Sequence, residues 1–241
     1  MSEANRFGAH EPGPEPEDGD AALIRPGSIT RIAEQRRKRG RVWVEIDGRH
    51  GLSLAADVVL RAGLGVGDAL DEAAILALRA ADERARATET ALAFLAYRPR
   101  SEREVRDRLR RGGFAQESID EVITRLYEWR YLDDADFARR WVESRTGEKP
   151  RGRRLLQQEL WKKGVDRETA REAIDEADLD EAAAAEALAR ARLASYAGDD
   201  PAVVRRRLGA YLARRGYGYD VVRGALERAM GEAEEEPDSF E

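Results

Sequence analysis

The sequence contains no cysteine and only two histidines, His10 and His50. Disulfides, thiolate nucleophiles and thiolate metal sites are therefore excluded. The chain also lacks the GxxxxGK[ST] phosphate loop, and Gly63, Gly65 and Gly67 have neither the spacing nor the strand–helix context of a dinucleotide site. We therefore expect a protein that is not an enzyme and that holds no cofactor and no metal ion.

Long apolar runs are absent as well. No stretch approaches the roughly 18 apolar residues that span a bilayer, and the first 20 residues lack the apolar centre of a secretion signal. These features predict a cytoplasmic protein that does not associate with a membrane.

The net charge of −6 conceals an alternation of basic and acidic blocks. Residues 98–163 carry 18 basic and 13 acidic side chains, and residues 201–230 carry seven and two. Residues 166–200, by contrast, carry four basic and eleven acidic side chains. Because a partner meets a local surface, the overall charge says little about what the chain binds.

The two ends of the chain have the composition of disordered segments. Residues 1–27 combine four of the eight prolines with glycine and acidic residues, and residues 231–241 are rich in glutamate. Such segments cannot bury enough apolar surface to fold. We expect both to be acidic tails without fixed structure.

Residues 28–70 have the pattern of a small β subdomain. Apolar residues alternate on both sides of Asp47-Gly48, a pair that favours a tight hairpin turn. Residues 29–32 predict a third strand, and residues 57–62 a short helical turn. The alternating residues are Val42, Val44, Ile46, Leu52 and Leu54.

An internal repeat of about 50 residues is the strongest signal beyond residue 70. Three segments align without gaps on a leucine that is followed four residues later by a glycine, and five further apolar columns match. The aligned pairs are Leu109/Gly113, Leu160/Gly164 and Leu212/Gly216. A match in seven columns is difficult to obtain from helical periodicity alone, because the glycine also falls in register.

Each repeat predicts a helix that buries one stripe and ends at the glycine, followed by a second amphipathic helix. A preceding helix completes each unit, at residues 91–97, 137–142 and 184–191. Three helices in about 50 residues are marginal alone, so neighbouring units should stack. The predicted fold is mainly α, an elongated array of three three-helix repeats with a small N-terminal antiparallel sheet. The predicted repeats are residues 71–134, 135–180 and 181–230.

Capping residues mark the starts of several predicted helices. Ser101 and Glu104 form a capping box in which each side chain can bond to the backbone N–H of the other residue. Asp71, Asp133 and Asp166 stand where further helices should begin.

In these segments the sequence resembles the RecX family, regulators of the bacterial RecA recombinase. The resemblance rests on the block from Ala91 to Val105, on Tyr131–Asp134 followed by Phe137-Ala138, and on Leu156 with Glu159–Val165. It covers roughly residues 28–228 and is weaker in the third repeat, where the helix at 181–194 is rich in alanine.

The resemblance implies a protein that binds the RecA filament on single-stranded DNA. Such a protein would suppress the recombinase, ATPase and co-protease activities of RecA and so modulate DNA repair and recombination. The family resemblance also implies direct contact with single-stranded DNA.

The repeat register identifies candidate binding residues. Six positions before the aligned leucine all three repeats carry arginine, and two positions after it all three are basic again. These sites lie eight residues apart, about 80° round an ideal helix, away from the buried stripe. The residues are Arg103, Arg154 and Arg206 in the first basic column, and Arg111, Lys162 and Arg214 in the second.

Further arginines flank these columns, namely Arg98, Arg100, Arg110, Arg151 and Arg153. A regular basic array could follow phosphates or the acidic flank of a filament. Exposed helix positions are often simply solvated, so an ordinary charged surface explains the same pattern. The basic run at residues 36–39 has the same two interpretations.

Aromatic residues add little to the binding hypothesis. Tyr97, Tyr131, Trp141 and Trp161 fall at or beside apolar helical positions, and we predict that they pack in the core. A stand-alone, nonspecific nucleic-acid-binding module remains the alternative function, although no helix is rich in the Asn, Gln and Ser residues that read bases.

Overall fold

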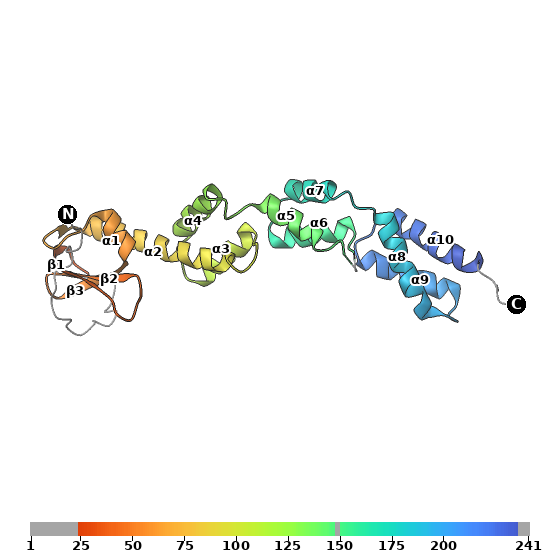
Figure 1. The fold of residues 1–241 in the computed structure, drawn as a ribbon, viewed down its shortest axis with the longest axis horizontal. Coiled ribbons are helices and arrows are strands. Elements are labelled where there is room, and N and C mark those ends of the chain that lie inside the picture. The colour runs from red at the N-terminus through yellow and green to blue at the C-terminus, as the bar shows by residue number, and fades with distance from the viewer. Residues whose placement is uncertain (1–23, 148–149, 236–241) are drawn as a thin grey trace, which may run out of the picture. The chain divides into compact units, whose positions relative to one another are not determined.

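The computed structural model describes residues 24–147 and 150–235. Within these residues the chain forms ten α-helices and one four-stranded antiparallel sheet, which confirms the predicted mainly helical fold (Figure 1). It divides into two compact units. The first unit comprises residues up to Ala96 together with Arg108–Arg125, and the second comprises Tyr97–Asp107 together with residues from Leu126 onward.

The N-terminal sheet has the strand order β3-β2-β1-β4. Asp47 and Gly48 both have positive φ, at 51° and 67°, as the tight turn between β2 and β3 requires. The predicted hairpin and third strand are therefore present, and residues 36–39 lie exposed between β1 and β2. The fourth strand has only two residues and no sequence signal. The strands are β1 (Gly27–Glu34), β2 (Arg41–Ile46), β3 (His50–Ala55) and β4 (Ala69–Leu70).

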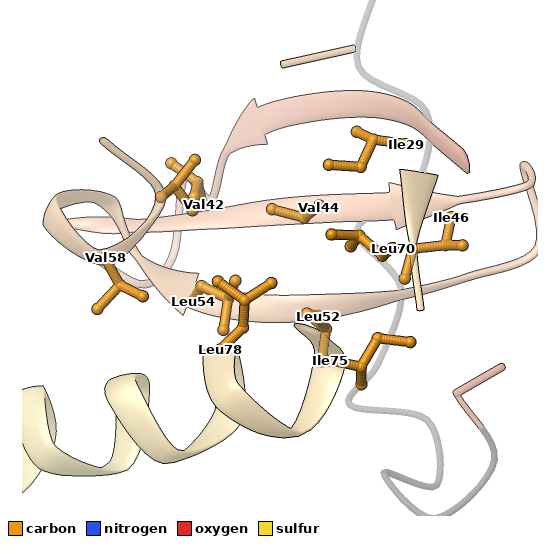
Figure 2. Close-up of a cluster of buried hydrophobic side chains, with 11 residues drawn as sticks. Ile29, Val42, Val44, Ile46, Leu52, Leu54, Val58, Leu70, Ile75 and Leu78 are labelled. Atoms are coloured by element: carbon orange, nitrogen blue, oxygen red, sulfur yellow. The ribbon is translucent and has the colours of Figure 1, made fainter. Parts of the chain in front are cut away.

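One face of this sheet packs on two helices, α1 (Ala56–Ala62) and α2 (Glu72–Leu95). The alternating residues of β2 and β3 point to this face because side chains alternate along a strand. They meet Val58 from α1 and Ile75 and Leu78 from α2 (Figure 2). The predicted turn at residues 57–62 is α1, and Asp71 caps α2 by accepting from the Ala74 N–H at 2.7 Å.

Three units of three helices follow, as the repeat predicts. The end of α2 precedes α3 (Glu102–Arg111) and α4 (Gln116–Glu128). The second repeat contains α5 (Asp134–Glu143), α6 (Arg153–Lys163) and α7 (Arg167–Glu176). The third contains α8 (Glu181–Leu193), a 3-10 turn η2 (Ala194–Tyr196), α9 (Pro201–Arg214) and α10 (Tyr219–Glu235).

The aligned apolar columns occupy equivalent buried positions. The three leucines of the alignment are completely buried, as are the apolar residues four positions before them. Each following glycine has a left-handed backbone, with φ of 77°, 90° and 89°. The buried residues are Val105, Leu109, Leu156, Leu160, Leu208 and Leu212.

The second and third repeats meet end to end at their central helices, α6 and α9. The N–H of Gly152, which caps α6, donates to the Arg215 carbonyl at the end of α9 at 2.9 Å. A Cβ on Gly152 would lie 2.5 Å from the Gly216 carbonyl group. The two backbones are therefore in direct contact, which only glycine permits at this point.

An equivalent joint connects the start of α3 with the end of α6. Ser101, in the position of Gly152, is fully buried, and its hydroxyl donates to the Lys163 carbonyl at 2.6 Å. Lys163 is the equivalent of Arg215. The hydroxyl thus satisfies a carbonyl that the helix end leaves without a partner. A Cβ on Gly164 would lie 2.4 Å from the Cβ of Arg103.

Each joint also uses an acidic residue of the following repeat. Asp134 accepts from the Glu102 N–H, and Glu181 accepts from the Arg153 N–H, both at 2.9 Å. These are the first backbone N–H groups of α3 and α6. A carboxylate is favoured there because it faces the positive end of a helix.

The third repeat ends the series with its own cap. Helix α9 begins at Pro201, and Asp200 accepts from the Ala202 and Val203 N–H groups. Asp200 therefore lies in the same repeat as the helix that it caps, unlike Asp134 and Glu181. Helix α10 continues to Glu235, past the predicted boundary at residue 230. The rest of the predicted C-terminal tail and residues 1–23 of the N-terminal tail lie outside the described residues.

Three of the four aromatic predictions are wrong. Tyr97, Tyr131 and Trp161 are 90%, 58% and 61% exposed. Tyr97 and Tyr131 lie in the turns after α2 and α4, and Trp161 follows the buried Leu160 by one residue, about 100° away from the buried stripe. Trp141 does pack against the second core and stacks on Phe137 at 5.8 Å.

The joint geometry predicts different costs for two alanine substitutions. Gly113→Ala places a side chain on a residue with a left-handed backbone, but nothing lies within 4 Å of the new Cβ. We expect the free energy of unfolding to fall by about 1 kcal/mol. Gly164→Ala adds the clash with Arg103 and should cost about 1–3 kcal/mol more. Denaturant unfolding of both full-length variants measures the difference. Equal losses would contradict the joint.

Candidate protein and nucleic-acid interface

The two basic columns lie on the exposed sides of the central helices. All six side chains are exposed, whereas the aligned apolar residues of the same helices, such as Val105, Leu156 and Leu208, are buried. Helices α3, α6 and α9 each carry a second-column residue near their end, whereas the first-column residue lies near the start of α3 and α6 and in the middle of α9. The members are Arg103, Arg154 and Arg206 in the first column, and Arg111, Lys162 and Arg214 in the second.

Four of these cations, Arg154, Lys162, Arg206 and Arg214, form no ion pair with any residue in the part of the chain that the structure describes. Arg103 approaches Asp107 at 4.0 Å, which is a weak contact between exposed groups. Most of the positive charge of the columns is therefore available to a partner.

Several flanking arginines have internal partners instead. Arg98 pairs with Glu104 at 3.0 Å, and Arg151 pairs with Glu159. Arg153 reaches Asp175 at 2.5 Å and Glu181 at 3.9 Å. These three predicted binding residues thus contribute to contacts within the repeats and at the joints. Arg100 is half-buried and Arg110 is exposed on α3.

The joints bring together basic residues that are separate on a single helix. Arg103 contacts Gly164, directly after Lys162 and Lys163 at the end of α6. Arg154 lies close to Gly218, with its Nη2 3.8 Å from the position of a Cβ there, shortly after Arg214 at the end of α9. The first column of one repeat therefore comes near the second column of the next. The sequence register did not show this, because it compares repeats without placing them in contact.

Glu104 partly neutralises the basic side chains at the joint between α3 and α6. It accepts from Lys163 Nζ at 2.8 Å and from Arg98 at 3.0 Å. Burial acts to raise the pKa of Glu104, but the hydrogen bonds and charges of Arg98 and Lys163 outweigh it, so the pKa lies below its usual value. The Ser101–Glu104 capping box is also confirmed, with both reciprocal bonds present at 3.4 and 3.3 Å.

Trp141 fixes two further cations beside this joint. The Arg145 guanidinium lies 3.8 Å and the Lys163 ammonium 5.0 Å from the ring centroid. The indole N–H donates to Glu159 at 3.0 Å. The ring therefore holds Lys163 in place through a cation–π contact.

Residues 24–147 and 150–235 contain no group of three or more His, Asp or Glu side chains that is placed to hold a metal ion. Over the same residues, every helix is too short or too polar to cross a membrane.

Three family models match consecutive parts of the chain. They are described as the first, second and third three-helix domains of RecX, and they match residues 87–126, 133–174 and 179–226. These ranges follow the three repeats described above.

Curated relatives and solved structures agree with these matches. The chain is 34% identical over 212 residues to the regulatory protein RecX of Bacillus velezensis, covering 86% of this chain and 80% of the relative. It is 30% identical over 209 residues to the Bacillus subtilis protein of the same name, covering 86% and 79%. A crystal structure of regulatory protein RecX matches with a TM-score of 0.70 at 22% identity, covering 85% of this chain and 98% of that one. The structure of RecX from Lactobacillus salivarius matches with a TM-score of 0.58 at 24% identity, covering 62% and 98%.

The environment of Glu104 predicts a pH-dependent contribution to stability. Its lowered pKa stabilises the fold above the ordinary value of 4.5, and this stabilisation is lost as the pH falls through the folded-state value. Glu104→Gln keeps the capping geometry but removes the charge, so it should cost about 1–2 kcal/mol at pH 7.

The difference between wild type and Glu104→Gln should shrink below about pH 4.5, as measured by urea unfolding at several pH values. Glu128→Gln is the matched control, because Glu128 is exposed on α4 and has no ion pair among the described residues. A difference that does not change with pH would contradict the assignment.

Proposed function

Because the chain belongs to the RecX family of regulatory proteins, we propose that it binds the RecA filament on single-stranded DNA and inhibits it. The inhibition would extend to the recombinase, ATPase and co-protease activities, and the protein itself would catalyse no reaction. The observation that supports this proposal is the pair of basic columns, which recur at the same exposed positions in all three repeats.

Equivalent repeats suit a partner that is itself repetitive. The two joints connect equivalent positions, Ser101 with Lys163 and Gly152 with Arg215, so the neighbouring cations recur at both joints. A nucleoprotein filament offers phosphates and acidic side chains at regular intervals. Binding would release counterions from the partner and would therefore weaken with salt.

The unpaired cations also support the alternative, a nonspecific binder of nucleic acid alone. Phosphates would satisfy Arg154, Lys162, Arg206 and Arg214 equally well. The two functions differ in whether the protein surface of the RecA filament contributes to the affinity of this chain for the coated strand. The direct comparison is binding to a bare single-stranded oligonucleotide and to a RecA-coated oligonucleotide at the same moderate salt concentration. Much tighter binding to the coated strand supports the regulator, and equal affinities that both vanish with salt support the alternative.

Charge reversal of the unpaired cations should weaken the regulator. The triple substitution Arg154→Glu, Arg206→Glu and Arg214→Glu should leave helicity unchanged, because none of these side chains forms an ion pair within residues 24–147 and 150–235. We expect about a tenfold or greater rise in the concentration needed for half-maximal inhibition of the ATPase of RecA on single-stranded DNA.

A charge-matched control separates local contacts from net charge. It reverses three exposed arginines on α4, α7 and α10, outside both columns, and should inhibit almost as well as wild type. Equal inhibition by the column variant and the control would remove the columns from the interface. The control substitutions are Arg125→Glu, Arg167→Glu and Arg223→Glu.

The predicted cytoplasmic location and the role of the individual flanking arginines stay predictions.

A further inference from the structure

A pocket of about 710 Å³ lies beside the N-terminal sheet, and none of the residues that line it belongs to the basic columns. Its wall is formed by the edge strand β3 and by one side of helix α2. The polar and aromatic side chains that carry the following argument are Lys38, Arg41, Trp43, Arg79, Asp82 and Glu83.

Both acidic residues of the pocket already have partners. Asp82 is 5% exposed and accepts from two Arg41 nitrogens at 3.1 Å, from Arg86 at 3.1 Å and from the Ala55 N–H at 2.7 Å. Glu83 accepts from the Ala115 N–H at 2.8 Å. The charge of Asp82 is therefore already balanced by Arg41 and Arg86, whereas the backbone bond orients Glu83 without neutralising it.

Arg79 is the cation that these acids leave without a partner. Its side chain is half-buried on α2, its Nη2 atom is buried, and its guanidinium makes no hydrogen bond or ion pair with any described residue. A buried charged donor without an acceptor is costly. The pocket thus contains a fixed site that favours an anionic oxygen, and Lys38 adds positive charge at its rim.

Trp43 supplies an aromatic surface in the same pocket. Its ring lies against Gly51, where a Cβ would come within 2.8 Å of ring atoms Cε2 and Cζ2. Glycine on the neighbouring strand therefore leaves room for the ring and fixes its position. The ring is partly exposed, and its N–H makes no hydrogen bond with a described residue.

We propose that this pocket binds one nucleotide of a single-stranded nucleic acid, with a phosphate on Arg79 and the base against Trp43. Stacking on an aromatic ring combined with a cation for the backbone is the usual chemistry of single-strand binding. This inference goes beyond the proposed function, because it concerns the N-terminal sheet and bare strands and does not depend on the repeats.

An acidic peptide fits the pocket less well. A peptide would bind most readily by adding a strand to the edge of β3. That edge is already blocked, because the Ser53 carbonyl accepts from Arg41 and the Ala55 N–H donates to Asp82. A peptide would also leave the face of Trp43 without a matching group.

The test measures binding of the full-length protein to a fluorescent 15-residue oligothymidylate by anisotropy. We use a background in which the unpaired column residues are reversed, so that the signal reports the pocket. Arg79→Gln should weaken binding about tenfold, and its fold should be unaffected because Arg79 has no partner to lose. Arg49→Gln removes the same charge from an exposed, unpaired position in the hairpin turn and should have little effect.

The contribution of Trp43 separates a nucleotide from other anions. Trp43→Leu should weaken binding about fivefold or more, and Trp43→Tyr, which keeps a ring, should retain most of the affinity. An abasic strand of the same length and polyglutamate should both bind more weakly than oligothymidylate. Equal binding of polyglutamate, or equal effects of Arg79→Gln and Arg49→Gln, would overturn the proposal.

Photo-crosslinking makes the outcome independent of the filament assay. An oligonucleotide that carries 5-iodouracil should crosslink to a peptide containing Trp43. Crosslinks confined to peptides of α6 and α9 would reject the pocket while leaving the proposed function intact. Loss of filament inhibition in the column variant with an unchanged crosslink at Trp43 would support both the pocket and the columns as separate contacts.

Discussion

Direct contact between helix ends is the constraint on which the repeat architecture depends. At each joint the start of one central helix meets the end of the next, at Ser101 with Lys163 and at Gly152 with Arg215. Helix ends carry N–H and carbonyl groups without internal partners, and their partial charges are opposite. At Gly152 a backbone N–H bonds the carbonyl directly, and at Ser101 the hydroxyl does so, but only small residues allow either approach.

The contact between helix ends also determines where basic side chains lie close together. The end of α6 carries Lys162 and Lys163, and the joint adds Arg103 from the repeat before it. Glu104 compensates part of this charge from inside the joint, while Lys162 is exposed and forms no ion pair with any residue that the structure describes. A stabilising contact and a candidate binding surface are thus built from neighbouring residues. For any substitution at this joint, both the stability of the variant and its binding to the partner must therefore be measured.

The N-terminal sheet is held together by different contacts. Its hydrophobic face packs on α1 and α2, and a single buried carboxylate, Asp82, ties α2 to β2 and β3. By using Arg41 and Arg86, Asp82 leaves Arg79 as the unpaired cation of the pocket. A structural interaction thereby defines the chemistry of the neighbouring cavity.

The sequence alone determined the elements and their repetition. Alternation in residues 42–54 gave the hairpin, and the Leu109, Leu160 and Leu212 register gave three equivalent helical units, because burial periodicity and turn residues are local properties of the chain. Exposure of Tyr97 and Tyr131 did not follow from that periodicity, since both lie beyond the helix ends.

Only the tertiary structure decided which of the arginines form ion pairs within the described part of the chain. Arg98, Arg151 and Arg153 each pair with an acidic residue outside their own loop or helix, whereas Arg154 and Arg206 have no such partner among the described residues. The same holds for Arg79, whose lack of an acceptor depends on how Asp82 and Glu83 are used by distant residues. Each of these ion pairs depends on how a loop or a second helix packs against the helix that carries the acid, so helical periodicity does not predict it.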